Sequence, residues 1–197
     1  MHFKFFYQNS RLLLFGIIMS FTSSFGQTFF ISLFGPSIQF EFGLSHTSWG
    51  TIYLIGTLLS AIILTYSGSL IDHYRLNFYT YFSVIALVFS CFFISIVSGY
   101  FFLIFAVFLL RQTGQGLTSH ISVTTMARYF SEKRGTAIAI GSLGMAIGEA
   151  ILPFVVIILI SLIGWRLTYF SSSIFILFCL FPIIVLLLNG YKERFIE

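Results

Sequence analysis

The chain has 197 residues, of which 58% are hydrophobic and 8% are charged, and its formal net charge is +4. A soluble domain carries about 25% charged residues, which it needs to cover a water-facing surface. The composition therefore excludes a soluble globular protein and predicts an integral membrane protein. The basic residues gather at the ends of apolar segments, which indicates membrane topology and argues against nucleic acid as a partner.

Six apolar segments are long enough to cross the lipid bilayer, because a membrane-spanning helix needs about 20 mostly apolar residues. In chain order we expect these spans at about 12–34, 48–71, 78–98, 101–127, 136–163 and 167–188. The connections between them are short, and the first span is too long for a signal peptide. The sequence thus predicts an all-α membrane protein in which residues 1–197 form a single six-helix transmembrane bundle.

Lysine and arginine residues predict the orientation of the spans, because cytoplasmic loops are richer in them. Arg166 alone falls on the predicted outer side, and Arg111 lies inside a span. The remaining basic residues fall on the predicted cytoplasmic side: Lys4, Arg11, Arg75, Arg128, Lys133, Arg134, Lys192 and Arg194. We therefore expect a multi-pass protein with both termini in the cytoplasm, in the plasma (inner) membrane of a bacterium.

An internal repeat relates the first three spans to the last three. Span two opens with WGTIYLIGTLLSA from Trp49 and span five with RGTAIAIGSLGMA from Arg134, and six of these thirteen positions are identical. The tetrapeptide TYFS recurs at Thr80 in span three and at Thr168 in span six. Chance similarity between apolar segments is the alternative explanation.

The first and fourth spans correspond in the same way, with Gly26-Gln27 in one and Gly114-Gln115 in the other. Each repeat has three spans, which is an odd number, so the second repeat enters the membrane from the opposite side. The fold class predicted is two inverted three-helix repeats, at about 12–98 and 101–188. Inverted repeats are typical of secondary transporters, whose substrate site lies near the middle of the membrane.

Two ionisable groups of opposite sign are predicted near the membrane midplane. Arg111 in span four lies roughly 15 Å deep and Glu149 in span five roughly 20 Å deep, at about 1.5 Å per residue. Such charges are costly in hydrocarbon and normally face a bundle interior or a water-filled cavity. In one interpretation, Arg111 binds an anionic solute and Glu149 couples a proton. In the other, the two residues pair and fix the packing of two helices.

Three further polar residues are predicted to bind the substrate with Arg111. Gln115 and Ser119 follow Arg111 by four and eight residues, which places them on the same face of an α-helix. Gln27 in span one is the repeat counterpart of Gln115. His120 is expected on the opposite face, at about 100° per residue.

Small residues in spans four and five predict close helix packing, because they let two backbones approach each other. Gly141, Gly144 and Gly148 lie on one face of span five. Pro153 stands where it would kink that helix. The sequence assigns Gly114 and Gly116 in span four to packing as well.

The loop after span two resembles a signature of the major facilitator superfamily of transporters. It reads GSLIDHYRL, and it matches the family pattern G-x-x-x-D-[RK]-x-G-[RK]-[RK] at Gly68 and Asp72. His73 replaces the first basic residue, Arg75 stands in the place of the second glycine, and the final basic pair is missing. The resemblance implies that Gly68, Asp72 and Arg75 form a gating loop.

Spans four and five are similar to further signatures of the same family. RQTGQG begins with Arg111 and is similar to R-x-x-Q-G-x-G, which implies a role for this arginine in proton coupling or substrate binding. GSLGMAIGEAILP keeps Gly144 and Gly148 of the antiporter signature but has Glu149 in place of a proline, which argues against antiport. The loop ARYFSEKRGTAIAIGSLG is similar to that of organic-anion branches.

The resemblance covers the N-terminal six-helix half of a family whose members usually have twelve spans. In that family the glycine face of span five packs against the second half. Here that face and Arg111 would be left facing lipid. The expected partners are therefore the missing second six-helix half or a second copy of this chain, besides the lipid bilayer and a small-molecule solute.

The sequence predicts a secondary active transporter, or the N-terminal half of one, that moves a small anionic solute with protons by alternating access. The alternative is a truncated or assembly half-transporter subunit without transport activity of its own. An enzyme is not expected, because H-E-x-x-H and G-x-S-x-G motifs are missing. A nucleotide-driven pump is not expected within this sequence, because it contains no P-loop motif. No cofactor or metal is expected either, since Cys91 and Cys179 lie in apolar runs and are interpreted as small hydrophobic residues.

Overall fold

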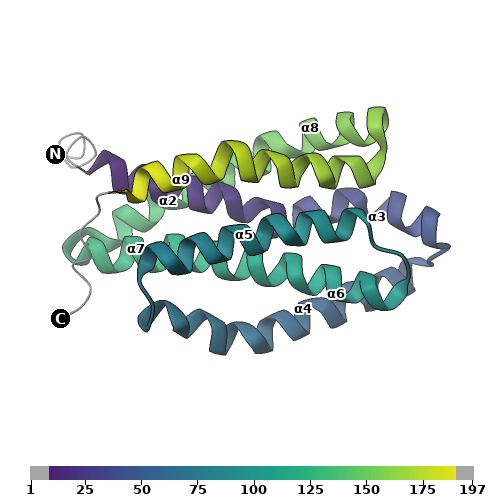
Figure 1. Ribbon diagram of the computed structural model, residues 1–197, viewed down its shortest axis with the longest axis horizontal. Helices are drawn as coiled ribbons and strands as arrows, with labels where there is room; N and C mark the ends of the chain where they lie inside the picture. The colour runs from purple at the N-terminus through teal and green to yellow at the C-terminus, as the bar shows by residue number, and fades with distance from the viewer. Residues whose placement is uncertain (1–8, 190–197) are drawn as a thin grey trace.

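A computed structural model describes residues 9–189, which form helices and turns and contain no strand. Figure 1 shows the helices running side by side along the long axis of an elongated bundle. Three of the predicted cytoplasmic basic residues, Lys4, Lys192 and Arg194, lie outside the described residues. The predicted all-α fold is confirmed for the part of the chain that the structure describes.

The bundle contains α-helices joined by short turns and interrupted by two π-helical stretches. In chain order they are α2 (Ser10–Ser23), the 3₁₀ turn η1 (Ser24–Gly26), α3 (Thr28–Phe42), α4 (His46–Ser69), the 3₁₀ turn η2 (Leu70–Asp72), α5 (Leu76–Ser95), α6 (Tyr100–Leu110), the π-helix η3 (Arg111–Thr118), α7 (Ser119–Tyr129), the 3₁₀ turn η4 (Ser131–Lys133), α8 (Arg134–Phe175), the π-helix η5 (Ile176–Leu180) and α9 (Phe181–Leu188).

Five continuous segments of the described chain are long and apolar enough to cross a membrane: Ser10–Phe42, His46–Asp72, Leu76–Ser95, Tyr100–Tyr129 and Ser131–Leu188. The last has 58 residues, far more than the roughly 20 that one crossing requires. It is interrupted at Gly164, whose φ of 79° and ψ of 165° are not helical. Figure 1 shows α8 turning back on itself. Six separate spans, with the repeat that relates them, stay a prediction.

The first span departs from its prediction as a single helix over 12–34. It extends to Phe42 and is divided into α2 and α3 by the turn η1 and by Gln27, whose φ of −77° and ψ of 156° are extended. The break coincides with a close crossing, because a Cβ added to Gly26 would overlap the carbonyl oxygen of Leu110 in α6. Hydropathy is averaged over many residues, so it does not detect one extended residue.

The first and fourth segments form the centre of the bundle. In each of them 61% of the most apolar window is buried, against 22% for the second segment and 33% for the last. The second segment contains α4, and the last begins with η4 and α8. These two segments therefore leave broad apolar faces open to lipid or to a partner.

The glycine face of α8 packs against α2 within the same bundle. A Cβ added to Gly144 would overlap the carbonyl oxygen of Ile17, and one added to Gly148 would overlap the hydroxyl of Ser24. Gly141 faces Met126 of α7 at 3.2 Å. The expectation that this face is left for the second half or for lipid is wrong here, because the missing side chains let α8 lie directly on α2. α8 also continues through Pro153 before its interruption at Gly164.

Candidate functional site: Arg111 at the break in span one

Arg111 is the first residue of the π-helix η3, which runs to Thr118 between α6 and α7. π-helical stretches are rare and are frequently found at functional sites. Arg111 is buried, with 8% of its surface exposed, while Gln115 is exposed and Ser119 is half-buried. The predicted common face of these three residues is therefore not buried as one surface.

The guanidinium of Arg111 reaches across to the break in span one. Its Nη1 donates a hydrogen bond of 3.0 Å to Thr28 Oγ1 and a long one of 3.4 Å to the carbonyl oxygen of Gly26. The hydroxyl of Tyr53 in α4 donates to the same Thr28 oxygen over 2.9 Å. The Arg111 Cζ also lies 5.6 Å from the centre of the Tyr53 ring, within cation–π range. Three spans therefore meet at this guanidinium.

No carboxylate balances the charge of Arg111 in the described part of the chain. The carboxylates there are those of Glu41, Asp72, Glu132 and Glu149, and none forms an ion pair with Arg111. Glu149 is exposed on α8. The pair expected under the packing interpretation is thus not formed in this structure, which leaves a buried cation held by neutral partners.

The residues directly after Arg111 form a buried polar ladder that sequence reasoning passed over. Gln112 Nε2 donates to Ser67 Oγ over 2.7 Å, and Ser60 Oγ donates to Gln112 Oε1 over 3.1 Å. The next residue, Thr113, forms a hydrogen bond of 3.1 Å between its hydroxyl and that of Ser90 in α5. The available signal was the polar run RQT inside an apolar span. These side chains satisfy one another and anchor η3 to α4 and α5.

Backbone contact fixes η3 against the break in span one. A Cβ added to Gly114 would overlap the Cα of Gly26, so the two glycines touch through their main chains. Gly116 faces Leu64 of α4 at 3.0 Å. Gly114 lies where the neighbouring main chain leaves no room for a side chain, while Gly116 packs tightly on a leucine side chain. The close approach at Gly114 holds Arg111 beside Thr28.

The end of the bundle that holds Asp72 contains the predicted gating loop. Asp72 forms an ion pair with Arg128 of α7. Gly68 lies beside His120, because a Cβ added to Gly68 would lie 3.7 Å from His120 Nε2. These four residues help to line a surface cavity of about 450 Å³. Arg75 precedes α5 as its N-cap residue. The structure thus adds Arg128 and His120 to the surroundings of the predicted loop.

The opposite end of the bundle is closed by Arg166, which follows the interruption of α8. Arg166 Nη2 lies 2.7 Å from Glu41 Oε1, and its Nε also donates to this oxygen, over 2.9 Å. Nη1 donates to the carbonyl oxygen of Ser95, and Nη2 to that of Val97, over 2.9 and 2.7 Å. We call Arg166 with these partners the Arg166 clasp. It joins the last turn of α3 to the segment that links α5 and α6.

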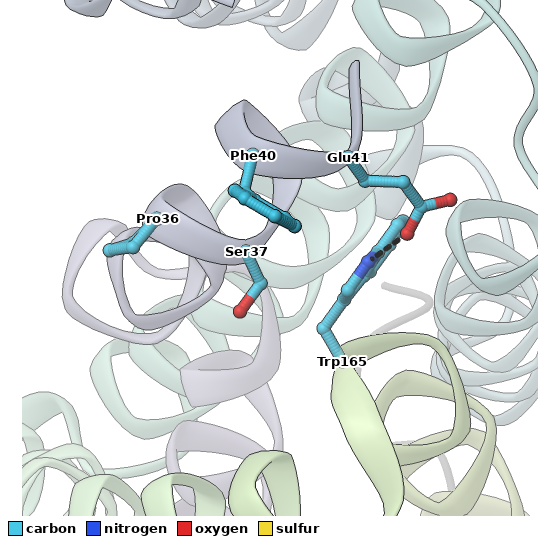
Figure 2. A pocket seen from close by; sticks show the side chains of 5 residues that line it. All are labelled: Pro36, Ser37, Phe40, Glu41 and Trp165. Atoms are coloured by element: carbon cyan, nitrogen blue, oxygen red, sulfur yellow. Dashed lines mark hydrogen bonds between the residues drawn. The ribbon is translucent and has the colours of Figure 1, made fainter. Parts of the chain in front are cut away.

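Trp165 completes the contact with Glu41. Figure 2 shows the indole Nε1 donating to Glu41 Oε2, a bond of 2.6 Å, while Pro36, Ser37 and Phe40 line the same side of α3. Together these five residues border a cavity of about 470 Å³. The cavity is open and mostly apolar, and its carboxylate is already engaged. This arrangement favours a structural role for Glu41.

A family model described as the Major Facilitator Superfamily matches residues 16–194, nearly the whole chain. The chain belongs to the major facilitator superfamily. A comparison with curated proteins gave no match. The superfamily consists of membrane transporters rather than enzymes, so the buried cation in span four belongs to a transporter fold.

The remaining predicted binding and proton-coupling residues of this superfamily member do not bond to Arg111 in the described part of the chain. Gln27 is half-buried at the break, Gln115 and Ser119 follow along span four, and Glu149 stands on α8. No hydrogen bond joins any of them to Arg111 within residues 9–189. Their roles in binding and proton coupling stay predictions. The described residues contain no group of three metal-ligating side chains.

Proposed function

We propose that this chain is a secondary active transporter, or the N-terminal half of one, that moves a small anionic solute together with protons. The observation that carries the proposal is the buried guanidinium of Arg111, which has no carboxylate partner among the described residues. A charge inside a membrane span is costly unless it faces a partner or water. An anionic solute supplies the missing counter-charge, and the planar donor fork of arginine suits a carboxylate or phosphate.

The contact between Gly26 and Gly114 supports a transporter built from inverted repeats. These glycines are equivalent in the two proposed repeats and lie 88 positions apart. Two residues related by a twofold axis touch each other only where the axis passes between them. Their main chains are in contact, which favours a pseudo-twofold axis beside Arg111. In such transporters, the substrate site lies near the membrane midplane and is reached by alternating access.

The open faces of α4 and α8 support a partner across the site. Thr28, which bonds to Arg111, is exposed, and so is Gln115, four residues after Arg111 in the chain. Glu149 is exposed on α8. We propose that a second six-helix half, or a second copy of this chain, covers this face and encloses the solute. Glu149 then couples the proton. The distribution of basic residues supports a cytoplasmic location for both termini. We propose that the protein lies in the plasma membrane of a bacterium.

A half-transporter that only assembles with a partner is the second candidate. The extensive apolar surface of α4 and α8 favours it equally, because assembly alone would bury that surface. The two functions differ in whether transport depends on Arg111 and Glu149. An assembly subunit tolerates neutral residues at both positions as long as the bundle folds.

Solute uptake into proteoliposomes tests the proposal. The protein would be reconstituted and offered a panel of radiolabelled carboxylates and phosphate esters, with and without an inward proton gradient. We expect the gradient to raise the uptake of at least one anion. Glu149→Gln should abolish this stimulation, while the matched exposed change Ser142→Ala on the same helix should leave it intact. An unchanged response to the gradient in Glu149→Gln would remove Glu149 from the mechanism.

A further inference from the structure

The break in span one leaves the beginning of a helix inside the membrane. α3 starts at Thr28, and its first backbone hydrogen bond from the break runs from the Ile31 N–H to the carbonyl oxygen of Gln27, over 3.1 Å. The N–H groups of Thr28, Phe29 and Phe30 come before Ile31 in the chain and have no acceptor within the helix. The side chain of Gln27 does not cap them. The first N–H groups of a helix need partners from outside the helix. Here the described residues provide none.

A buried and incompletely bonded cation stands at the same point. Arg111 uses only its Nη1 as a donor, while its Nε and Nη2 have no hydrogen-bond partner among residues 9–189. The guanidinium bonds to Thr28, the first residue of α3, so it is directed at the uncapped end of that helix. Arg111 has 8% of its surface exposed, which keeps water from solvating these donors fully.

Two positive electrostatic centres therefore face each other at the break. The N-terminus of a helix carries roughly half a positive charge, and the guanidinium carries a full one. Their repulsion is strong where the surroundings have a low dielectric constant. The neutral partners of Arg111, which are the Gly26 carbonyl, the Thr28 hydroxyl and the Tyr53 ring, are dipoles and do not cancel the charge. An anion between the two centres would be attracted by both of them.

We propose that the break and Arg111 together form a subsite for one carboxylate group of the transported solute. The free Nε and Nη2 donors of Arg111 bind the carboxylate as a fork, and the first-turn N–H groups of α3 donate to it from the other side. Gln27 is half-buried and Thr28 is exposed, so the subsite is open on this face of the bundle. The inference rests on the proposed function and deepens it, because it assigns main-chain donors of span one to the solute.

Gln27→Asp tests the subsite by building a carboxylate into it. Aspartate is a favoured N-cap residue, and a negative charge at a helix N-terminus is stabilising. Purified protein would be melted in detergent with sodium acetate, benzoate or succinate, against sodium chloride at matched ionic strength. We expect a saturable rise in the melting temperature of the parent with at least one carboxylate. Gln27→Asp should melt higher than the parent without any ligand and should lose the carboxylate response.

Ser142→Asp is the control, because it adds the same negative charge at an exposed position of α8 outside the break. It should keep the response to the carboxylate, whereas Arg111→Gln should lose it. The subsite is overturned if Gln27→Asp retains the parent response, if chloride gives the same saturable rise, or if the parent responds to none of the three carboxylates. A response lost in Arg111→Gln but kept in Gln27→Asp overturns the subsite and leaves the proposed function standing.

Thr28→Pro gives an independent test of the main-chain donors. Proline is well tolerated as the first residue of a helix, and the extended Gln27 has the conformation that a following proline requires. The change removes the Thr28 N–H and hydroxyl, while Thr28→Ala removes the hydroxyl alone. We expect carboxylate binding to be about tenfold weaker in Thr28→Pro than in Thr28→Ala. Equal binding by the two variants would show that this N–H takes no part and would overturn its assignment.

Discussion

Arg166 at one end of the bundle donates hydrogen bonds from all three of its guanidinium nitrogens, whereas Arg111 in the middle of span four donates from one. Arg166 has Glu41 as a counter-ion, two backbone carbonyls as acceptors and the Trp165 ring 4.5 Å from its Cζ. Arg111 has a hydroxyl, a distant carbonyl and a tyrosine ring. The more exposed of the two arginines is thus the more completely bonded one.

This difference separates structural from functional charge. A guanidinium whose donors are all engaged within the chain stabilises the contact between the elements that it joins. A guanidinium with free donors inside a span lowers stability and is retained for what it binds. The Arg166 clasp belongs to the first kind, and we propose that Arg111 belongs to the second, although both residues are arginines in a chain with few charges.

The largest expected effect is on transport by Arg111→Gln. Glutamine fills similar space without charge, so solute uptake should fall by about a hundredfold as charge-assisted hydrogen bonds to the anion are lost. The melting temperature without solute should not fall, because a buried charge with no counter-ion is removed. Uptake assays and thermal unfolding of the same preparation check both expectations.

Arg111→Lys sharpens the interpretation of that result. Lysine keeps the charge but presents a compact ammonium in place of the planar fork, so uptake should be intermediate between the parent and Arg111→Gln. Normal uptake in Arg111→Gln, or a marked loss of stability in either variant, would show that Arg111 is structural and would remove the contrast with Arg166.

Arg166→Gln should have the opposite consequence. It leaves Glu41 without its counter-ion and frees the carbonyl oxygens of Ser95 and Val97, so the free energy of unfolding should fall by about 2 kcal/mol. Residual uptake per folded molecule should stay near that of the parent. Denaturant unfolding combined with uptake normalised to folded protein checks this. A large loss of uptake at unchanged stability would place Arg166 in the transport cycle.

The smallest expected effect is that of Asp72→Asn on stability. The pair of Asp72 with Arg128 is a single contact between side chains that are 48% and 39% exposed, so water screens it. Its loss should lower the free energy of unfolding by less than about 1 kcal/mol. An uptake defect larger than that of Arg166→Gln would support the gating role that Asp72 is predicted to have. Equal stability losses in the two variants would contradict the ranking of the two ends.

The parts of this protein that depend on composition and local sequence were predicted correctly. The scarcity of charge and the long apolar segments predict an all-α membrane protein, since only helices satisfy their backbone groups within one segment. The family followed from short motifs around Asp72 and Arg111, and the family comparison confirms it. Arg111 itself stands out in the sequence because a charge inside an apolar span is rare.

The surroundings of Arg111 could not be predicted in the same way. Helical periodicity placed Gln115 and Ser119 beside it, but periodicity within one helix does not tell which side chains a neighbouring helix covers. The break in span one and α4 cover Arg111 and leave Gln115 exposed. Matching depth suggested a pair with Glu149, but depth does not specify how each helix is rotated about its own axis. Gln112 was overlooked because its partners, Ser60 and Ser67, come from another span.

By itself the sequence determined that this protein is helical, lies in a membrane, belongs to a transporter family and carries one arginine in the interior of a span. Only the tertiary structure decided that span one breaks at Gln27, that the glycine face of α8 packs on α2, and that Arg111 faces the beginning of α3. Hydrophobicity and charge are properties of single residues and short windows, so they can be read along the chain. Helix rotation, close glycine contacts and a single extended residue depend on which segments meet in space.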